Sequence, residues 1–416
     1  MKKQTCSNIC AYLIAVVIMV NCRSVWLSNP SWTSVLNMGL YLILVCGSIC
    51  LLLINFDSIN NLKSTILVSL FVFLYFFVYL LFNSVNLKSN LLLLIILILF
   101  LWIVQIKGKK LPIILEAYSN VIVLIAAISI LMWLTCSLLK LMSPSGYVQF
   151  NWTSTEGIYK LIPTYKNIYF ETQDITLPVV GNIIRNTAIF TEAPMASLNF
   201  CLAFLIKIVM RSKTKTTIWL IIAILTTFST TGYILLILIF FLKWLETNKN
   251  QFIYKLLFMV PVLIIAIIGI NLLIGQRATY GTQSTSLRLD DYKVGLTTFL
   301  QHPLFGAGLG NSMALTENMA SWRWRISMIG FSNSIAEVLA QGGIYVSIAY
   351  MYAFIRGLYL TIKFKSLDNF ILILGTFYLF CTTIFSYQYI LLLLLVLFAK
   401  FEIYLKIVNC NNKLNT

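Results

Sequence analysis

The sequence predicts an all-α polytopic membrane protein of about 12 transmembrane helices (11 to 13), with two large extracytoplasmic loops that contain short helices. Two observations predict this class. The chain of 416 residues is 60% hydrophobic and only 10% charged, whereas a soluble domain carries roughly 25% charged residues. Its mean hydropathy of +0.90 implies more apolar surface than a soluble fold can bury, because even a domain of roughly 300 residues leaves about a quarter of its surface exposed. Lipid therefore has to solvate much of this chain.

The apolar stretches are continuous, as in residues 66–82 and 91–106, and lack the apolar–polar alternation of membrane β-strands. In hydrocarbon, a helix satisfies its own backbone hydrogen bonds within such a stretch. A spanning helix needs about 20 largely apolar residues. On this template the twelve candidate spans are residues 9–27, 35–54, 65–82, 91–106, 120–141, 189–210, 216–228, 231–245, 252–274, 344–362, 370–385 and 390–405.

The net charge of +17, from 30 Lys and Arg against 13 Asp and Glu, has a topological explanation. Most lysines lie at the ends of predicted spans, and cytoplasmic loops are rich in Lys and Arg. This predicts a multi-pass protein of the bacterial cytoplasmic membrane with both termini cytoplasmic, and no nucleic-acid partner. Basic cytoplasmic loops alternate with outer loops along the whole chain only if residues 226–232 form a tight turn between two spans. Residues 1–20 resemble a signal peptide, but we expect an uncleaved first helix because more spans follow.

Two predicted outer loops are much longer than the others. We use them as the boundaries between groups of transmembrane helices. Both are rich in aromatic residues, so we expect ordered caps with short amphipathic helices rather than disorder. The expected segments are N-terminal transmembrane helices (1–142), a first large outer loop (143–188), central transmembrane helices (189–275), a second large outer loop (276–332), and C-terminal transmembrane helices with a cytoplasmic tail (333–416).

Arginines in or beside these two loops are the first candidates for binding. Arg185 directly precedes an apolar helix, and Arg288 lies in the second loop beside Asp290 and Asp291. Guanidinium groups bind phosphate oxygens bidentately and keep their charge at any relevant pH. Two such groups over a membrane cavity suit a diphosphate. The alternatives are interfacial snorkelling and Arg–Asp pairing within the loop, in which Asp290 orients Arg288.

Four short motifs, in order along residues 185–362, resemble those of the O-antigen/capsular polysaccharide polymerase and O-antigen ligase superfamily. The segments that carry the resemblance are Arg185 with Phe-Thr-Glu-Ala-Pro (190–194), Leu-Thr-Thr-Phe-Ser-Thr-Thr-Gly (225–232), Arg-Leu-Asp-Asp-Tyr (288–292) with His-Pro-Leu-Phe-Gly-Ala-Gly-Leu-Gly-Asn (302–311), and Asn-Ser-Ile-Ala-Glu-Val-Leu-Ala-Gln-Gly-Gly (333–343).

The resemblance implies a membrane glycosyltransferase that uses an undecaprenyl-diphosphate-linked glycan at the outer face of the cytoplasmic membrane. It also implies that Arg185 and Arg288 hold the diphosphate. Arg277, in the second large loop with Arg288, is a third candidate for diphosphate binding. The expected partners are the lipid-linked oligosaccharide, the growing polysaccharide, a flippase and a chain-length regulator. We expect no cofactor and no metal, because the sequence has no Asp-x-Asp motif and a single histidine.

The candidate catalytic residues are Glu192 and Glu337, each just inside a predicted helix at the outer side. Supporting roles toward the substrate are expected for Asp290, Gly306, Gly308 and Asn333. The glycine run 306–310 is not a dinucleotide fingerprint, because no βαβ pattern surrounds it. We expect a tight turn or a close backbone approach to the lipid headgroup.

The leading prediction is a polymerase of lipid-linked repeat units for capsule or O-antigen. Ligases of the superfamily carry a histidine just before the Asn-containing segment, whereas this chain has Phe331 and Ser332 there. The only histidine, His302, is interpreted as a turn residue. The alternatives are a ligase that transfers finished glycan to another acceptor, and a lipid-linked oligosaccharide flippase, which would place polar residues near the bilayer midplane.

Overall fold

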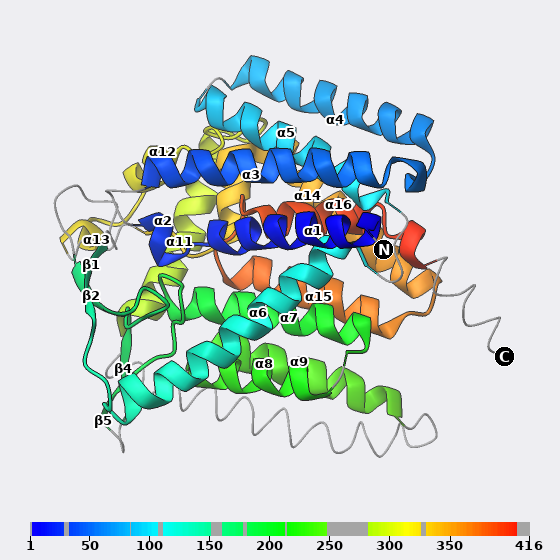
Figure 1. Ribbon diagram of the computed structural model, residues 1–416. Coiled ribbons are helices and arrows are strands. Elements are labelled where there is room, and N and C mark those ends of the chain that lie inside the picture. Colours follow the sequence, from blue (N-terminus) through cyan, green and yellow to red (C-terminus); the bar gives the residue numbers. More distant parts are fainter. Residues whose placement is uncertain are drawn as a thin grey trace.

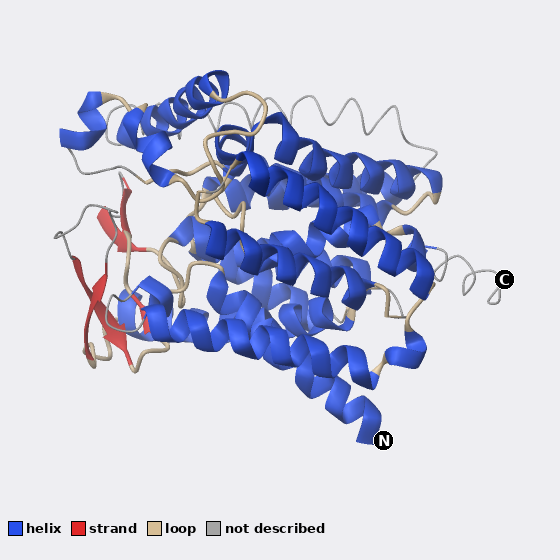
Figure 2. Cartoon of the chain, turned by 90° about the horizontal axis from the view of Figure 1, so that it is seen from above, coloured by secondary structure: helices blue, strands red, loops and turns tan. Residues whose placement is uncertain are grey.

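The computed structural model describes residues 2–28, 33–83, 85–106, 111–150, 160–177, 181–212, 214–247, 282–325 and 330–405. Long helices form a bundle in which most lie roughly side by side (Figure 1). The strands gather at one end of this bundle, and the N-terminus lies at the other (Figure 2). We call the end that carries the strands and α11–α13 the loop face.

Among the described residues, seven helices are long and apolar enough to cross a membrane, and three shorter apolar helices accompany them. The polytopic helical class is therefore confirmed, while the number of spans stays a prediction. Eleven of the twelve predicted spans fall on helices, and the span at 252–274 lies outside the described residues. The bundle helices are α1 (Lys2–Asn21), α3 (Thr33–Ile54), α4 (Leu62–Phe82), α5 (Leu87–Val104), α6 (Ile113–Met132, continued by a π-helical turn Trp133–Leu138), α7 (Ala193–Met210), α8 (Thr214–Thr226), α9 (Thr230–Thr247), α14 (Ser334–Lys363), α15 (Leu367–Thr382) and α16 (Tyr389–Ala399).

Helices α7 and α16 form the centre of the bundle. All residues from Ile390 to Phe398 in α16 are buried, as expected for a helix that is apolar on every side. α7 packs against α6, α8, α9 and α15, and α16 packs against α5 and α14. The peripheral α4 leaves most of its apolar side chains exposed, a surface that suits contact with lipid.

The predicted turn within residues 226–232 is confirmed. α8 ends at Thr226 and α9 begins at Thr230. The apolar stretch therefore forms two helices and not one long helix. The Thr227 hydroxyl donates to the Ile224 carbonyl at 2.7 Å. Gly232 allows α9 to approach α7, because a Cβ there would lie 2.3 Å from the Ser197 hydroxyl oxygen.

The prediction of short helices in the first large loop is wrong, because the described part of this loop is built from strands. Its β-branched and aromatic side chains pack well on a pleated surface, and positive φ values at Lys166 and Asn167 allow a tight turn. Ile162 and Phe170 bury against Val25. The antiparallel strands are β1 (Gly146–Phe150), β2 (Lys160–Tyr165) and β3 (Tyr169–Phe170) in one sheet, and β4 (Asp174–Leu177) with β5 (Gly181–Ile184) in another.

The second large loop contains short helices, as predicted. They are α11 (Thr282–Gln301), α12 (Ser312–Glu317) and α13 (Ser321–Arg325), and a short α2 (Val25–Ser28) lies after α1. Helix α11 crosses the start of α14 so closely that a Cβ at Gly295 would lie 2.7 Å from the Ala336 Cβ. This contact holds the second loop against the bundle.

Helix α14 is broken at Gly343, where φ is 60°, and the turn that follows α11 fills the break. The amides of Ile344 and Tyr345 donate to the carbonyls of Pro303 and Leu304 at 2.9 and 3.0 Å. In return, the Gly308 amide donates to the Gln341 carbonyl at 2.9 Å. The turn therefore satisfies backbone groups that the broken helix leaves unpaired, which a membrane bundle requires.

Gly306→Ala is expected to lower the thermal stability of the protein strongly. Gly306 has a φ of 70°, and a Cβ there would lie 2.3 Å from the Gln341 carbonyl, so strain of about 1–3 kcal/mol adds to a backbone clash. The melting temperature of the purified protein measures the loss. Gly39→Ala is the matched control, because nothing lies within 4 Å of its added Cβ. Equal melting temperatures for the two variants would contradict the docked turn.

Candidate active site

Arg185 joins the first large loop to the turn between α8 and α9. Its half-buried guanidinium donates to the Thr227 carbonyl at 2.9 Å and to the Phe228 carbonyl at 3.1 Å. It also donates to Gln173 Oε1 at 3.4 Å. Carbonyls at the end of a helix carry partial negative charge, so this position attracts a cation. Arg185 is therefore held at the loop face at a defined place.

Arg288 lies on α11. Its charge acts on Tyr378, and the Tyr378 hydroxyl donates to the Thr231 carbonyl at 3.3 Å. Within the described parts of the chain, none of the ion pairs includes Arg288. Tyr378 therefore lies near both Arg288 and the start of α9, and a shared site of Arg185 and Arg288 stays a prediction.

Glu192 and Glu337 lie at the starts of α7 and α14. Glu192 occupies the N-cap position of α7, and its Oε1 lies 3.9 Å from Arg23 NH1. The Arg23 charge also acts on Glu337. Backbone pairing fixes this arrangement, because the Thr191 amide donates to the Arg23 carbonyl at 3.0 Å.

Glu337 is positioned by the chain that connects α15 and α16. The Ser386 hydroxyl donates to Glu337 Oε2 at 2.6 Å. Asn333 caps α14 by accepting hydrogen bonds from the amides of Ile335 at 3.1 Å and Ala336 at 3.4 Å. Asn is a preferred N-cap residue. Because α14 begins after Asn333, the Glu337 carboxylate lies in the first turn of this helix.

Gln173 connects the arginine and glutamate groups. Its Oε1 accepts from Arg185 and, at 3.0 Å, from the Ala193 amide directly after Glu192. We call the residues Arg23, Gln173, Arg185, Glu192 and Glu337 the polar centre. Contacts link the first four, whereas Glu337 is related to them through the charge of Arg23. Helices α7 and α14 both begin here, and their N-terminal amides favour a bound anion.

Several buried polar atoms next to the polar centre have no hydrogen-bond partner among the described residues. Buried polar atoms are normally paired, so these are available to ordered water or to a ligand rich in hydroxyl groups. The atoms are Ser24 Oγ, Thr172 Oγ1, Thr191 Oγ1 and Asn333 Nδ2.

Asp290 contacts Arg323, whereas the sequence suggested that it orients Arg288. Arg323 is fully buried, and its NH1 lies 3.1 Å from Asp290 and 2.7 Å from Asp291. Ser332 donates to Asp291 through its amide at 3.0 Å and through its hydroxyl. Burial raises the pKa of the Asp291 carboxyl, against the opposing effects of Ser332 and the Arg323 charge. This cluster ties α11 and α13 to the segment that leads into α14.

Gly306 and Gly308 face the protein itself. The expected close backbone approach is present, but its described partners are the α14 backbone and, for Gly308, Asn83, whose Oδ1 would lie 2.8 Å from an added Cβ. Arg277 lies outside the described residues. No group of three His, Cys, Asp or Glu able to hold a metal occurs in the described ranges.

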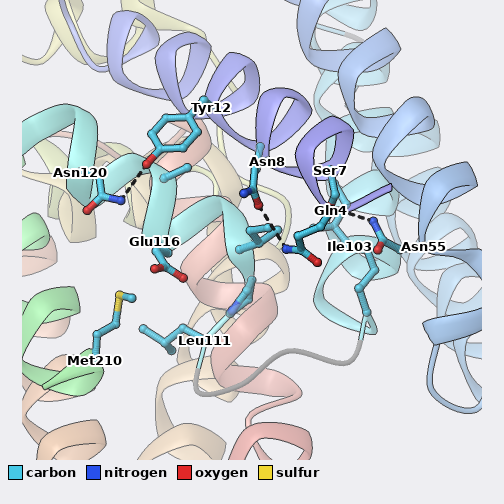
Figure 3. A pocket seen from close by; sticks show the side chains of 15 residues that line it. Gln4, Ser7, Asn8, Tyr12, Asn55, Ile103, Leu111, Glu116, Asn120 and Met210 are labelled. Atoms are coloured by element: carbon cyan, nitrogen blue, oxygen red, sulfur yellow. Dashed lines mark hydrogen bonds between the residues drawn. The ribbon is translucent and has the colours of Figure 1, made fainter. Parts of the chain in front are cut away.

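A cavity of about 710 Å³ lies at the opposite end of the bundle, beside the N-terminus (Figure 3). Its lining includes Tyr12 of α1 and Glu116 and Asn120 of α6. None of the candidate site residues lines it, so its size does not make it the place of the expected chemistry.

Arg23 and Gln173 are the residues of the polar centre that the sequence analysis did not select. A usable signal was present, because Arg23 lies in a predicted short outer loop, where the distribution of positive charge predicts few cations. Its two carboxylate neighbours follow by 169 and 314 residues in the chain, since 192 − 23 = 169 and 337 − 23 = 314. Only the fold brings them together.

The comparison with known proteins agrees with this geometry. Residues 215–351 match the family model for O-antigen ligase, and a search of curated proteins finds no match. The matched segment includes the turn between α8 and α9, Arg288, the glycine turn and Glu337. The resemblance is therefore confirmed for the motifs within residues 215–351, where the chain is similar to the O-antigen ligase family.

Proposed function

We propose that the protein polymerises undecaprenyl-diphosphate-linked oligosaccharide repeat units, for capsule or O-antigen, at the outer face of the cytoplasmic membrane. The family match points to a membrane enzyme of the glycosyltransferase or ligase type. The observation that carries the finer proposal is the polar centre. There, Arg185 is joined through Gln173 to the start of α7, and Arg23 pairs with Glu192.

The proposed reaction is a glycosyl transfer. An acceptor sugar hydroxyl attacks the anomeric carbon of the donor glycan, the bond from that carbon to the diphosphate oxygen breaks, and the lipid diphosphate leaves with the electron pair. Arg185 and Arg288 stabilise the charge that develops on the leaving group, which is typically the largest contribution in such a site. The acceptor proton passes to Glu337, the carboxylate that Ser386 orients.

The orientation follows from charge. The end of the bundle opposite the loop face carries Lys3, Lys63, Arg211, Lys363 and Lys365, as expected of a cytoplasmic side. The loop face is then extracytoplasmic, where lipid-linked repeat units would be supplied by a flippase. A chain-length regulator would contact the same protein from the membrane or from this face.

A ligase is the second candidate, because the matched family is described as O-antigen ligase. The absence of a histidine in residues 331–333 favours the polymerase. A flippase is less consistent with the fold, since the polar centre lies at one end of the bundle, whereas transporters bind substrate near the midplane.

Deletion of the encoding gene, followed by gel analysis of surface and lipid-linked glycan, tests this proposal. A polymerase mutant should display single repeat units on the carrier outside the cell. Full-length polymer retained on the carrier would instead identify a ligase. Lipid-linked glycan trapped at the cytoplasmic leaflet would identify a flippase.

A further inference from the structure

A second cavity, of about 480 Å³, opens at the loop face between the end of α4, the glycine turn and α12. This volume lies within the range of roughly 300–1,000 Å³ that is common for small-molecule sites. Its wall includes Phe82, Asn83, His302, Asn311 and Glu317. None of these residues belongs to the polar centre.

The aromatic part of the wall is exposed but fixed. Phe82 is 67% exposed, and its ring is stacked on that of Phe305 with a centroid distance of 4.4 Å and an interplanar angle of 12°. Phe305 packs in turn against Tyr345 at 5.1 Å, and Tyr345 stacks on Tyr75 at 4.2 Å. A ring held by such a column is a rigid apolar platform that loses little conformational entropy on binding.

Two polar side chains of the wall are held by hydrogen bonds, and two others can bind a ligand. Asn83 donates to the Gly306 carbonyl at 3.3 Å, and Asn311 donates to the Ala307 carbonyl at 2.9 Å. Among the described residues, the side chains of His302 and Glu317 have no hydrogen-bond partner in the protein, and both residues are exposed. The cavity therefore offers a carboxylate and an imidazole to a ligand.

The charge of the wall selects the class of ligand. The cavity lining contains one carboxylate, Glu317, and no Lys or Arg. A phosphate or diphosphate would meet a like charge without compensation. A neutral polyhydroxyl ring fits, because its hydroxyl groups can donate to Glu317 and its C–H face can pack on Phe82.

This cavity is connected to Glu337 of the polar centre through Gln341, Tyr387 and Ser386. Gln341 Oε1 accepts from the Gly310 amide at 3.0 Å and from the Tyr387 hydroxyl at 2.8 Å, and Tyr387 follows Ser386, the partner of Glu337. We propose that the Phe82–Glu317 cavity binds a sugar residue of the glycan chain outside the reaction centre. This inference rests on the proposed function and adds a substrate subsite to it.

The test compares Phe82→Ala and Glu317→Gln with the wild-type chain, purified in full and reconstituted in lipid nanodiscs. The probe is carrier-free oligosaccharide released from the native polymer by mild acid, and its binding is measured by saturation-transfer NMR. Each variant should bind the probe roughly tenfold more weakly. In cells, each should shorten the polymer.

Phe71→Ala is the matched control, since Phe71 lies on the same helix, is 64% exposed and does not line the cavity. Wild-type binding in Phe82→Ala, or an equal loss in Phe71→Ala, would overturn the subsite. Displacement of the probe by inorganic pyrophosphate would also overturn it, because it would show a phosphate site. If the wild-type chain binds the probe but forms no polymer, the proposed function fails and the subsite stands.

Discussion

Arg185→Ala is expected to eliminate long-chain polymer while the protein remains in the membrane. Loss of one preorganised cationic donor typically lowers the rate of the chemical step by about 10²–10³. Arg185 also binds two carbonyls of the turn between α8 and α9, so the variant disturbs the site as well. Gel analysis of surface glycan measures chain length, and an immunoblot of the membrane fraction measures the amount of protein.

Arg288→Ala separates the chemical effect from the structural one. None of the ion pairs among the described residues includes Arg288, so its removal should leave the fold intact and still eliminate long polymer. Arg185→Lys should restore activity only in part, because an ammonium group cannot form the bidentate contact. Arg211→Ala, which breaks the pair with Asp368 at the opposite end, is the control. Wild-type chain length in both alanine variants would refute diphosphate binding by these arginines.

Glu337→Gln is expected to lower the rate of glycosyl transfer by about 10²–10⁴, the usual contribution of a general base. Glutamine has nearly the same shape as glutamate and can still accept the hydrogen bond from Ser386, so α14 should stay in place. It cannot take up the acceptor proton. The initial rate of polymer formation in vesicles that contain lipid-linked repeat units measures the effect.

Glu192→Gln, assayed in parallel, identifies which carboxylate acts as the base. A large loss in Glu192→Gln with a wild-type rate in Glu337→Gln would transfer the role to Glu192. Glu246→Gln, which alters a carboxylate paired with Lys243 on the other end of the bundle, should behave as wild type. Unchanged rates in both site variants would exclude either glutamate as the base.

The class of the protein was predictable because it depends on local properties of the sequence. Continuous apolar stretches require helices in lipid wherever they occur, and the lysines at their ends mark the boundaries. For this reason the predicted spans that lie in the described residues fall on helices, and the break at residues 226–232 was found. The first large loop was mispredicted because short strands depend on partners distant in the sequence, as Ile162 does on Val25.

The sequence by itself determined a helical membrane bundle, two large loops and a set of charged residues at one end. Tertiary structure decided how those charges pair: Arg23 with Glu192, and Asp290 with Arg323 rather than with Arg288. It also decided that the glycine turn docks into the break in α14. The physical reason is that apolar burial follows from composition and period, whereas an ion pair or a backbone docking requires two distant segments to meet within a few ångströms.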